Sequence, residues 1–248
     1  MKKPNSFVRA PFDESLPPEQ RTERCIELSE LMMKIVTHII CYTLVDYREL
    51  LKEERLSVAH ALLQRVATTH LCNQKLTKEG LVLEYKGQPF TLHEEYKTMI
   101  LTRSVYEHLV VFYFLFEHPK TEVERALVWK NWKNSGKSFE VVEENGKLGV
   151  RKVSYAQAWN YLFQNAEKAQ FYGHLSIHSH PVFQGLILYQ SQGLTDQGND
   201  GIPLYFSCLF LAHLCRLFLK QVPDGQNIIR NEFSFQEQRV FSALSHMT

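Results

Sequence analysis

Apolar residues recur every three or four positions over much of this chain, which is the spacing of one face of an α-helix. Between Leu28 and Ile40 they occupy positions 28, 31, 32, 35, 36, 39 and 40, the pattern of a helix with one buried side. A second stretch, at about 49–73, places Ala59, Leu62 and Val66 on one face in the same way. Both stretches predict long amphipathic helices.

Capping boxes indicate four further helices. In a capping box a Ser or Thr side chain and a Glu or Gln three residues later satisfy free backbone N–H groups. The boxes are Thr91-x-x-Glu94, Thr121-x-x-Glu124, Ser154-x-x-Gln157 and Ser234-x-x-Glu237. They predict helices at about 92–117, 122–134, 155–180 and 235–247. The apolar segment 203–220 brings the total to about seven, and the helices at 92–117, 155–180 and 203–220 are expected to form the centre.

Two segments depart from the helical pattern. Residues 139–153 place Asn145-Gly146 between β-prone runs, which is the signal of a type I′ hairpin. Residues 81–90, with Gly87, are a weaker candidate for a second hairpin. The sequence therefore predicts an all-α, mainly helical fold with a short β-hairpin insertion. It forms one domain over residues 15–248, after a flexible arm at residues 1–14.

Composition narrows the class of protein. The 248 residues carry 28 Lys and Arg against 27 Asp and Glu, so no general basic field attracts nucleic acid. Five scattered cysteines without a C-x-x-C pair suit a reduced cytoplasm and argue against a disulfide or structural zinc framework. The segment from Ile202 to Leu219 approaches membrane-spanning length, but Pro203, His213 and Arg216 favour a core helix. We therefore expect a cytoplasmic protein without a membrane partner or cofactor.

A polar cluster interrupts the helix predicted at 92–117. Arg103 and Glu107 share one helix face, and His108 lies about 100° further round. The following segment, 109–116, is apolar on every side, which predicts burial. Charges facing such an interior must be paired. Arg103 and Glu107 therefore either neutralise each other as a structural pair or form part of a site.

A second cluster lies near residue 180. Tyr172, Ser176 and His180 fall on one stripe of the predicted 155–180 helix, whereas His174 and His178 fall on roughly the opposite side. A zinc site would need a third ligand from elsewhere, so no metal is expected. His180 precedes a proline at the predicted helix end, where it suits a general acid or base and equally a cap for free carbonyls.

The spacing Arg103-x4-His108 resembles the R-x4–6-H signature of HEPN-type ribonucleases. That resemblance implies an arginine that binds phosphate, a histidine that transfers a proton, RNA as substrate and a homodimer that pairs its motifs. The same spacing recurs at Arg55–His60 and Arg65–His70, so several of these matches must be accidental. Only Arg103–His108 has a neighbouring carboxylate in a strongly apolar helix.

Both clusters together are similar to those of a bacterial group of all-helical domains of unknown function, over residues 90–181. The matching positions are Arg103, Glu107, Ser176 and His180, and the β-prone segment at 139–153 is a departure. This resemblance implies a fold and a site but no reaction.

Two functions follow as hypotheses. One is a HEPN-like, metal-independent ribonuclease of a bacterial stress or defence system, in which Arg103 contacts phosphate and His108 or His180 moves the proton. Glu107 would orient the arginine, and Tyr172 and Ser176 would supply hydrogen bonds. The other is a non-catalytic helical module that binds a ligand or a protein. If the clusters form one site, Ser176 or His180 should lie within hydrogen-bonding or one-water reach of Arg103 or Glu107, with His174 and His178 turned away.

Overall fold

The computed structural model describes residues 15–79, 81–92, 95–163 and 201–246. Over these ranges the chain is mainly helical, with eight α-helices and two short β-hairpins, which confirms the predicted fold class. The helices are α2 (Pro18–Asp46), α3 (Glu54–Glu79), α4 (Glu95–Phe112), α5 (Glu122–Ser135), α6 (Tyr155–Leu162), α9 (Ile202–Leu219), α10 (Gly225–Glu232) and α11 (Phe235–Ser245). A 3₁₀ turn, η2 (Leu50–Lys52), precedes α3, and a π-helical turn, η3 (Tyr113–Glu117), continues α4.

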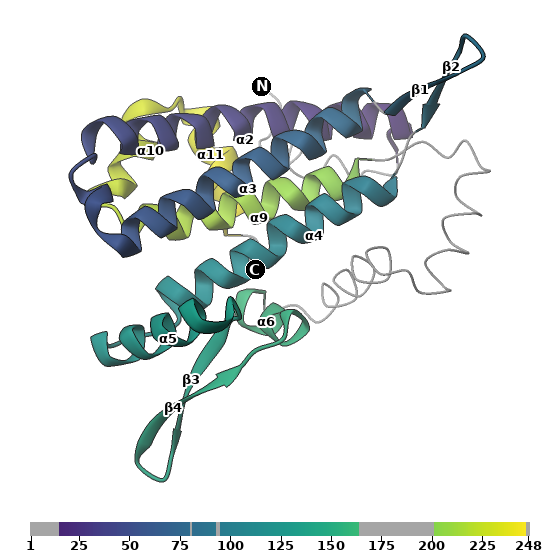
Figure 1. Cartoon of the computed structure of the whole chain (residues 1–248). Helices are drawn as coiled ribbons and strands as arrows, with labels where there is room; N and C mark the ends of the chain where they lie inside the picture. Colours follow the sequence, from purple (N-terminus) through teal and green to yellow (C-terminus); the bar gives the residue numbers. More distant parts are fainter. Residues whose placement is uncertain (1–14, 80, 93–94, 164–200, 247–248) are drawn as a thin grey trace.

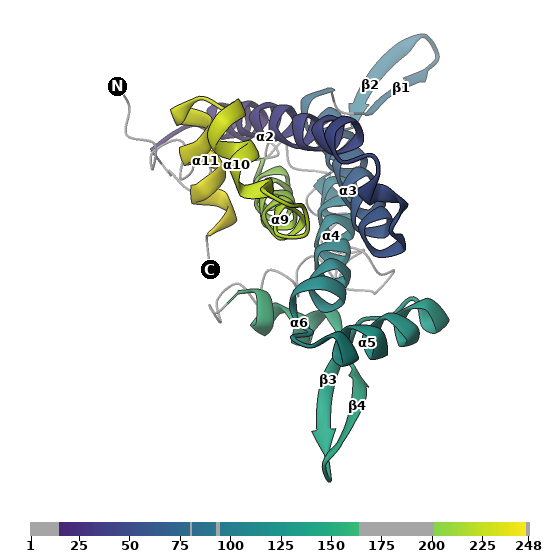
Figure 2. The same cartoon turned by 90° about the vertical axis from the view of Figure 1, so that its left-hand side faces the viewer.

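Helix α9 is the centre of the bundle. It packs against α2, α3, α4 and α11, and Figures 1 and 2 show it running between these helices. Its sequence explains this position, because apolar residues occupy every side of the helix and fifteen of its eighteen residues are buried. The prediction that the 203–220 segment is central is confirmed.

Burial accounts for most of the apolar surface of α9. By length and composition, α2, residues 98–117 and α9 could each cross a membrane, on a search of the described residues. In the fold 83% of the apolar window of α9 is buried inside the protein, compared with 39% for that of α2. The apolar surface of α9 therefore forms the protein core, as expected for a central core helix.

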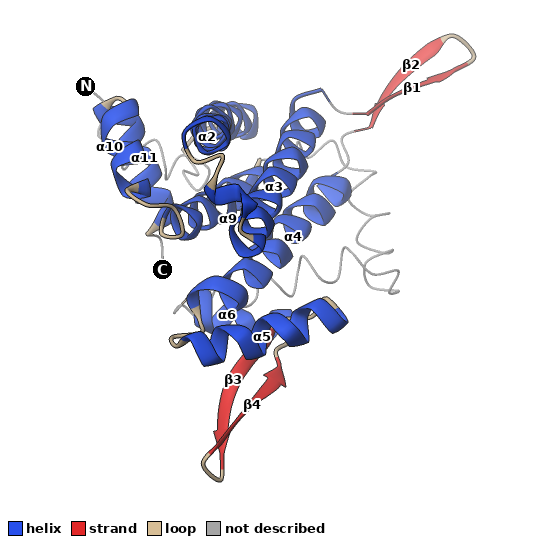
Figure 3. Ribbon diagram, turned by 60° about the vertical axis from the view of Figure 1, so that its left-hand side comes forward, coloured by secondary structure: helices blue, strands red, loops and turns tan. Residues whose placement is uncertain are grey.

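Two antiparallel hairpins project from the helices (Figure 3). Strands β3 (Phe139–Glu144) and β4 (Lys147–Lys152) are joined by Asn145 and Gly146, which both have positive φ angles, of 54° and 71°. A pair of left-handed residues defines the predicted type I′ turn. Strands β1 (Leu81–Tyr85) and β2 (Gln88–Leu92) form the weaker candidate hairpin. Both hairpins are confirmed.

Helix α4 begins later than predicted. Thr91 lies in β2, where it pairs with Val82, and the strand continues to Leu92, so no helix starts at residue 92. Among the described residues, α4 starts at Glu95. Pairing with Val82, nine residues earlier, therefore overrides the local capping signal.

A single helix over residues 155–180 is wrong. Helix α6 starts at its predicted capping box and ends at Leu162, because Phe163 has an extended backbone with φ −136° and ψ 116°. The buried Phe163 ring lies 5.8 Å from Phe210 and 5.2 Å from His213, both on α9. Packing of this ring is the physical reason for the break. Helix α6 lies against α4 at the border of the bundle rather than at its centre.

Residues 118–163 form an appendage on one side of the bundle, made of α5, the β3–β4 hairpin and α6 (Figures 1 and 3). Helix α5 starts at Thr121 with the predicted capping box. Exposed ion pairs link α5 to the start of α3, from Arg55 to Glu122 and from Lys133 to Glu54. Such exposed pairs contribute little to stability. The appendage is held chiefly where α5 and β3 meet η3, where α6 meets α4, and where Phe163 packs against α9.

Candidate functional site

Arg103 and Glu107 form an ion pair within α4. The Arg103 Nε atom donates to Glu107 Oε1 across 2.6 Å, as side chains four residues apart on a helix can. The Arg103 side chain is 13% exposed and that of Glu107 is 27% exposed. The pair therefore lies at the border between core and solvent, and the two charges neutralise each other there.

Tyr155, the first residue of α6, approaches this pair from outside α4. The hydroxyl of Tyr106 in α4 donates to the backbone carbonyl of Tyr155 across 2.6 Å. Burial raises the pKa of the Tyr155 phenol, and the Glu107 carboxylate raises it further, whereas Arg103 lowers it. Tyr155 is thus close enough to sense both charges. The sequence interpretation missed this residue, although its position directly after the Ser154 cap fixes it at the start of a helix.

His108 is held by its own helix. Its Nδ1 atom lies 2.7 Å from the carbonyl oxygen of Ser104. Because a carbonyl only accepts hydrogen bonds, Nδ1 carries the proton, which leaves Nε2 as the lone-pair atom of the neutral ring. Arg103 and His108 are five positions apart, about 140° around the helix, and each is bonded to a different group. Within α4 they do not converge on one point.

The second predicted cluster lies outside the described residues. Tyr172, Ser176 and His180, together with His174 and His178, all fall within residues 164–200. Their predicted contact with Arg103 or Glu107 therefore stays a prediction. The end of α6 at Leu162 removes one support for it, because the stripes assumed a continuous helix from residue 155.

His70 is a fully buried polar group that hydrogen-bonds to two other helices. Its Nε2 lies 2.8 Å from the Ser29 hydroxyl on α2, and its Nδ1 lies 2.7 Å from the Ser207 hydroxyl on α9. All three residues are fully buried. A neutral imidazole has one donor and one acceptor nitrogen, so one serine accepts a hydrogen bond and the other donates one. The three side chains join three helices, and each satisfies its neighbour.

The environment of His70 keeps its ring neutral. Burial lowers the pKa of His70 to about 3. The Cys208 thiol lies 3.8 Å from Nε2. Burial raises the pKa of this thiol, so the thiol is also neutral. The neighbouring Asn73 amide donates to the Thr102 hydroxyl, which donates to the carbonyl of Pro203. This polar layer has the hydrogen-bond partners for catalysis but no surface that a substrate could reach, so its role is structural.

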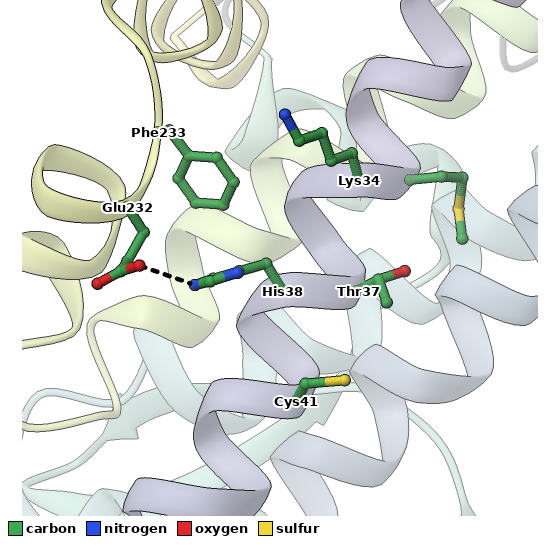
Figure 4. A pocket seen from close by; sticks show the side chains of 7 residues that line it. Lys34, Thr37, His38, Cys41, Glu232 and Phe233 are labelled. Carbon is green, nitrogen blue, oxygen red and sulfur yellow. Dashed lines mark ion pairs between the residues drawn. The ribbon is translucent and has the colours of Figure 1, made fainter.

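A shallow groove of about 550 Å³ lies between α2 and the turn that follows α10 (Figure 4). In it, His38 Nε2 lies 3.7 Å from Glu232 Oε2, and the Phe233 ring packs against the imidazole with centroids 5.1 Å apart. Lys34 pairs with Glu237, which holds the pKa of that carboxyl at about 2. The groove is lined by Met33, Lys34, Thr37, His38, Cys41, Glu232 and Phe233, and it contains no predicted site residue.

A further polar cluster joins the hairpin to α6. The Glu140 carboxylate in β3 accepts a hydrogen bond from Arg151 Nε at 2.6 Å and another from the Tyr161 hydroxyl. The Tyr161 ring also packs edge-on against His118, with centroids 5.6 Å apart. Glu140 is 8% exposed, so its hydrogen bonds replace the water that burial removes. These contacts hold the base of the hairpin rigidly on the appendage.

Within the described ranges, no three His, Cys, Asp or Glu side chains are placed to hold a metal ion together. Comparison with protein-family models, curated proteins and solved structures gives no match.

Proposed function

We propose that this chain is a non-catalytic helical module whose function is to bind another protein. The closed Arg103–Glu107 pair carries this proposal. The guanidinium is already neutralised within its own helix, and the Arg103 side chain is 13% exposed. A phosphate-binding arginine needs an accessible cation instead. On this proposal, the pair and Tyr155 form the structural joint between α4 and α6.

The shape of the molecule supports the same proposal. The appendage extends the chain beyond the helical bundle, and the β3–β4 hairpin projects from it (Figures 1 and 3). Isolated two-stranded hairpins are marginally stable, so an extended hairpin commonly packs against another surface. All five cysteines are free thiols, and Cys41 and Cys72 are exposed, which supports a reduced cytoplasmic setting as part of the proposal.

A specific observation favours a second candidate, the HEPN-like, metal-independent ribonuclease. The bond from His108 Nδ1 to Ser104 fixes the ring orientation and leaves Nε2 as a proton acceptor, as a general base requires. Because Arg103 and His108 diverge on α4, this candidate needs a second motif, from a homodimer partner or from His180. RNA would then be the substrate.

Two measurements on the purified full-length chain separate the candidates. The first is incubation with single-stranded and hairpin RNA, using the unmodified chain, Arg103→Ala and His108→Ala. The protein-binding module predicts no cleavage by any of them. Cleavage that both substitutions abolish would establish the ribonuclease and overturn the proposal. The second is thermal unfolding of the same variants, because a structural joint predicts that Arg103→Ala lowers stability.

A further inference from the structure

Strand β4 borders the second groove of the described chain, with a volume of about 570 Å³. The groove is more polar than the one beside α2, because its lining includes the cations Lys147, Arg151 and Lys152 against one carboxylate, Glu144. The full lining is Val142, Glu144, Lys147, Leu148, Gly149, Val150, Arg151 and Lys152. Every residue of β4 therefore contributes, so the groove follows the strand.

The outer edge of β4 offers backbone groups as well as charge. In the described part of the chain β4 pairs only with β3. Val153 N donates to Ser138 O across 3.0 Å, and paired positions in an antiparallel ladder alternate between bonded and non-bonded. The backbone groups of Leu148, Val150 and Lys152 therefore point away from β3. The Leu148 side chain is 45% exposed, so solvent and other molecules reach this edge.

The hairpin presents this edge from a fixed base. Glu140 accepts hydrogen bonds from both Arg151 and Tyr161, which ties β3, β4 and α6 together. Phe139, Val141 and Glu143 lie on the face of β3 opposite to that of Glu140. Strand β3 also packs against α5 and η3. A rigid edge loses little conformational entropy when another strand pairs with it.

We propose that the outer edge of β4 binds an extended acidic segment of a partner protein, which adds a third strand to the hairpin. This inference rests on the proposed protein-binding function. The segment's main chain bonds to the free groups of Leu148, Val150 and Lys152, as in other recognition by strand addition. Its carboxylates, at alternate positions, lie beside Lys147 and Arg151, which share one face of β4. Arg151 bonds to Glu140 through Nε, but its side chain is 67% exposed and so stays accessible, unlike that of Arg103. Charge complementarity selects an acidic partner rather than a basic one.

The lysines of β4 have an alternative explanation, because lysine on an edge strand discourages association with other strands. If that is their only role, no peptide should bind to this edge. Nucleic acid is another polyanion that cations could attract, but it does not use the outward backbone groups of a strand. A substitution that removes one such group without changing charge therefore distinguishes strand addition from charge attraction.

The test measures fluorescence anisotropy of a labelled eight-residue peptide of alternating Glu and Thr, titrated with the full-length chain. Three variants are compared with the unmodified chain. Lys147→Glu with Lys152→Glu reverses one cation on each face of β4 and leaves Arg151, which pairs with Glu140, unchanged. Leu148→Pro removes an outward N–H, which edge strands tolerate. Arg65→Glu with Lys75→Glu, at exposed positions on α3, is the matched charge control. Circular dichroism and thermal unfolding check that each variant is folded.

We expect saturable binding that weakens at least tenfold in the first two variants and changes less than about twofold in the control. An equivalent peptide of alternating Lys and Thr should not bind. Absence of binding overturns the inference, and so does undiminished binding by a folded Leu148→Pro variant. Tighter binding of an eight-nucleotide oligouridine, weakened by the Lys147 and Lys152 substitutions, assigns the edge to nucleic acid instead.

These outcomes are separable from a failure of the proposed function. The RNA-cleavage assay addresses Arg103 and His108 in the bundle, whereas the peptide titration addresses β4 in the appendage. A chain that neither cleaves RNA nor binds the peptide retains the protein-binding proposal and loses only the β4 edge. A chain whose RNA cleavage depends on Arg103 and His108 loses the proposed function, whatever the peptide does.

Discussion

His70 and Ser207 are 137 positions apart in the chain, yet the Nδ1 atom of one lies 2.7 Å from the hydroxyl oxygen of the other. With Ser29 they form a fully buried hydrogen-bonded chain across α2, α3 and α9. Each polar atom of this chain has a partner only while the three helices keep their relative positions. The layer therefore fixes the registry of the helices more than it adds to stability.

Replacing His70 alone should be costly. His70→Ala removes a large buried ring and leaves the Ser29 and Ser207 hydroxyls without their partner, so we expect stability to fall by about 3–4 kcal/mol. The triple variant Ser29→Ala, His70→Leu, Ser207→Ala replaces all three members of this hydrogen-bonded chain by apolar groups and should recover most of that loss. Urea unfolding of both variants measures the difference. If the triple variant is less stable than His70→Ala, the layer contributes net stability and our interpretation is wrong.

The same histidine should make stability fall in mild acid. Burial holds the pKa of His70 at about 3 in the folded protein, whereas the unfolded value is about 6.5. Below pH 6.5 the unfolded chain binds a proton that the folded chain does not. The stabilisation is therefore complete above pH 6.5 and declines as the pH falls towards 3. The slope is about 1.4 kcal/mol per pH unit, or roughly 2 kcal/mol between pH 6.5 and 5.

Urea unfolding at several pH values from 7.5 to 5 measures this dependence. His70→Leu is the matched control, because burial also lowers the pKa values of His60 and His118 and their contribution remains in that variant. The unmodified chain should lose about 2 kcal/mol more than His70→Leu over the range. Equal losses of stability in the two proteins would mean that His70 binds a proton in the folded protein as readily as in the unfolded chain.

Arg103→Ala should destabilise the protein moderately. An unpaired carboxylate in a fully buried position would cost about 3–5 kcal/mol. Glu107 is 27% exposed, however, so water can solvate it and we expect a loss of about 1–2 kcal/mol. The double variant Arg103→Ala, Glu107→Ala should recover part of this. Arg125→Ala, which breaks an exposed pair with Glu122, is the control and should change stability by less than about 0.5 kcal/mol. Equal effects at Arg103 and Arg125 would contradict a structural joint.

Features that depend on neighbouring residues could be predicted from the sequence. The capping boxes at Thr121, Ser154 and Ser234 each bond within four residues, and all three begin helices as predicted. The Asn145-Gly146 turn depends on two residues and is also confirmed. Thr91 shows the limit, because the same local pattern fails where the residue pairs with another strand.

The polar contacts between helices could not be predicted in this way. Ser29, His70 and Ser207 meet only because three distant helices pack together, and nothing near each residue identifies its partners. A signal did exist, since His70 falls on the same helix face as the apolar residues Leu63 and Val66. A lone polar residue on an apolar face predicts a buried hydrogen bond. The R-x4-H spacing of Arg65 and His70 carries no information on burial, so it does not identify this contact.

Helix α10 was not predicted from the sequence. Its first residue, Gly225, lies close to the end of α9. Gly225 follows directly after Asp224, and a Cβ atom at Gly225 would lie 2.2 Å from the carbonyl oxygen of Leu219 at the end of α9. Backbone atoms cannot move aside as a flexible side chain can, so Gly225→Ala should force α10 away from α9. We expect a loss of at least about 2 kcal/mol in the free energy of unfolding. Gly149→Ala in β4 is the matched control, because its Cβ would meet Val142 at an ordinary 3.8 Å and should leave stability unchanged or slightly higher. Urea unfolding measures the free energy of unfolding of the two variants. If the Gly225→Ala protein is as stable as the Gly149→Ala protein, the turn between α9 and α10 adapts to the added methyl group and the prediction is wrong.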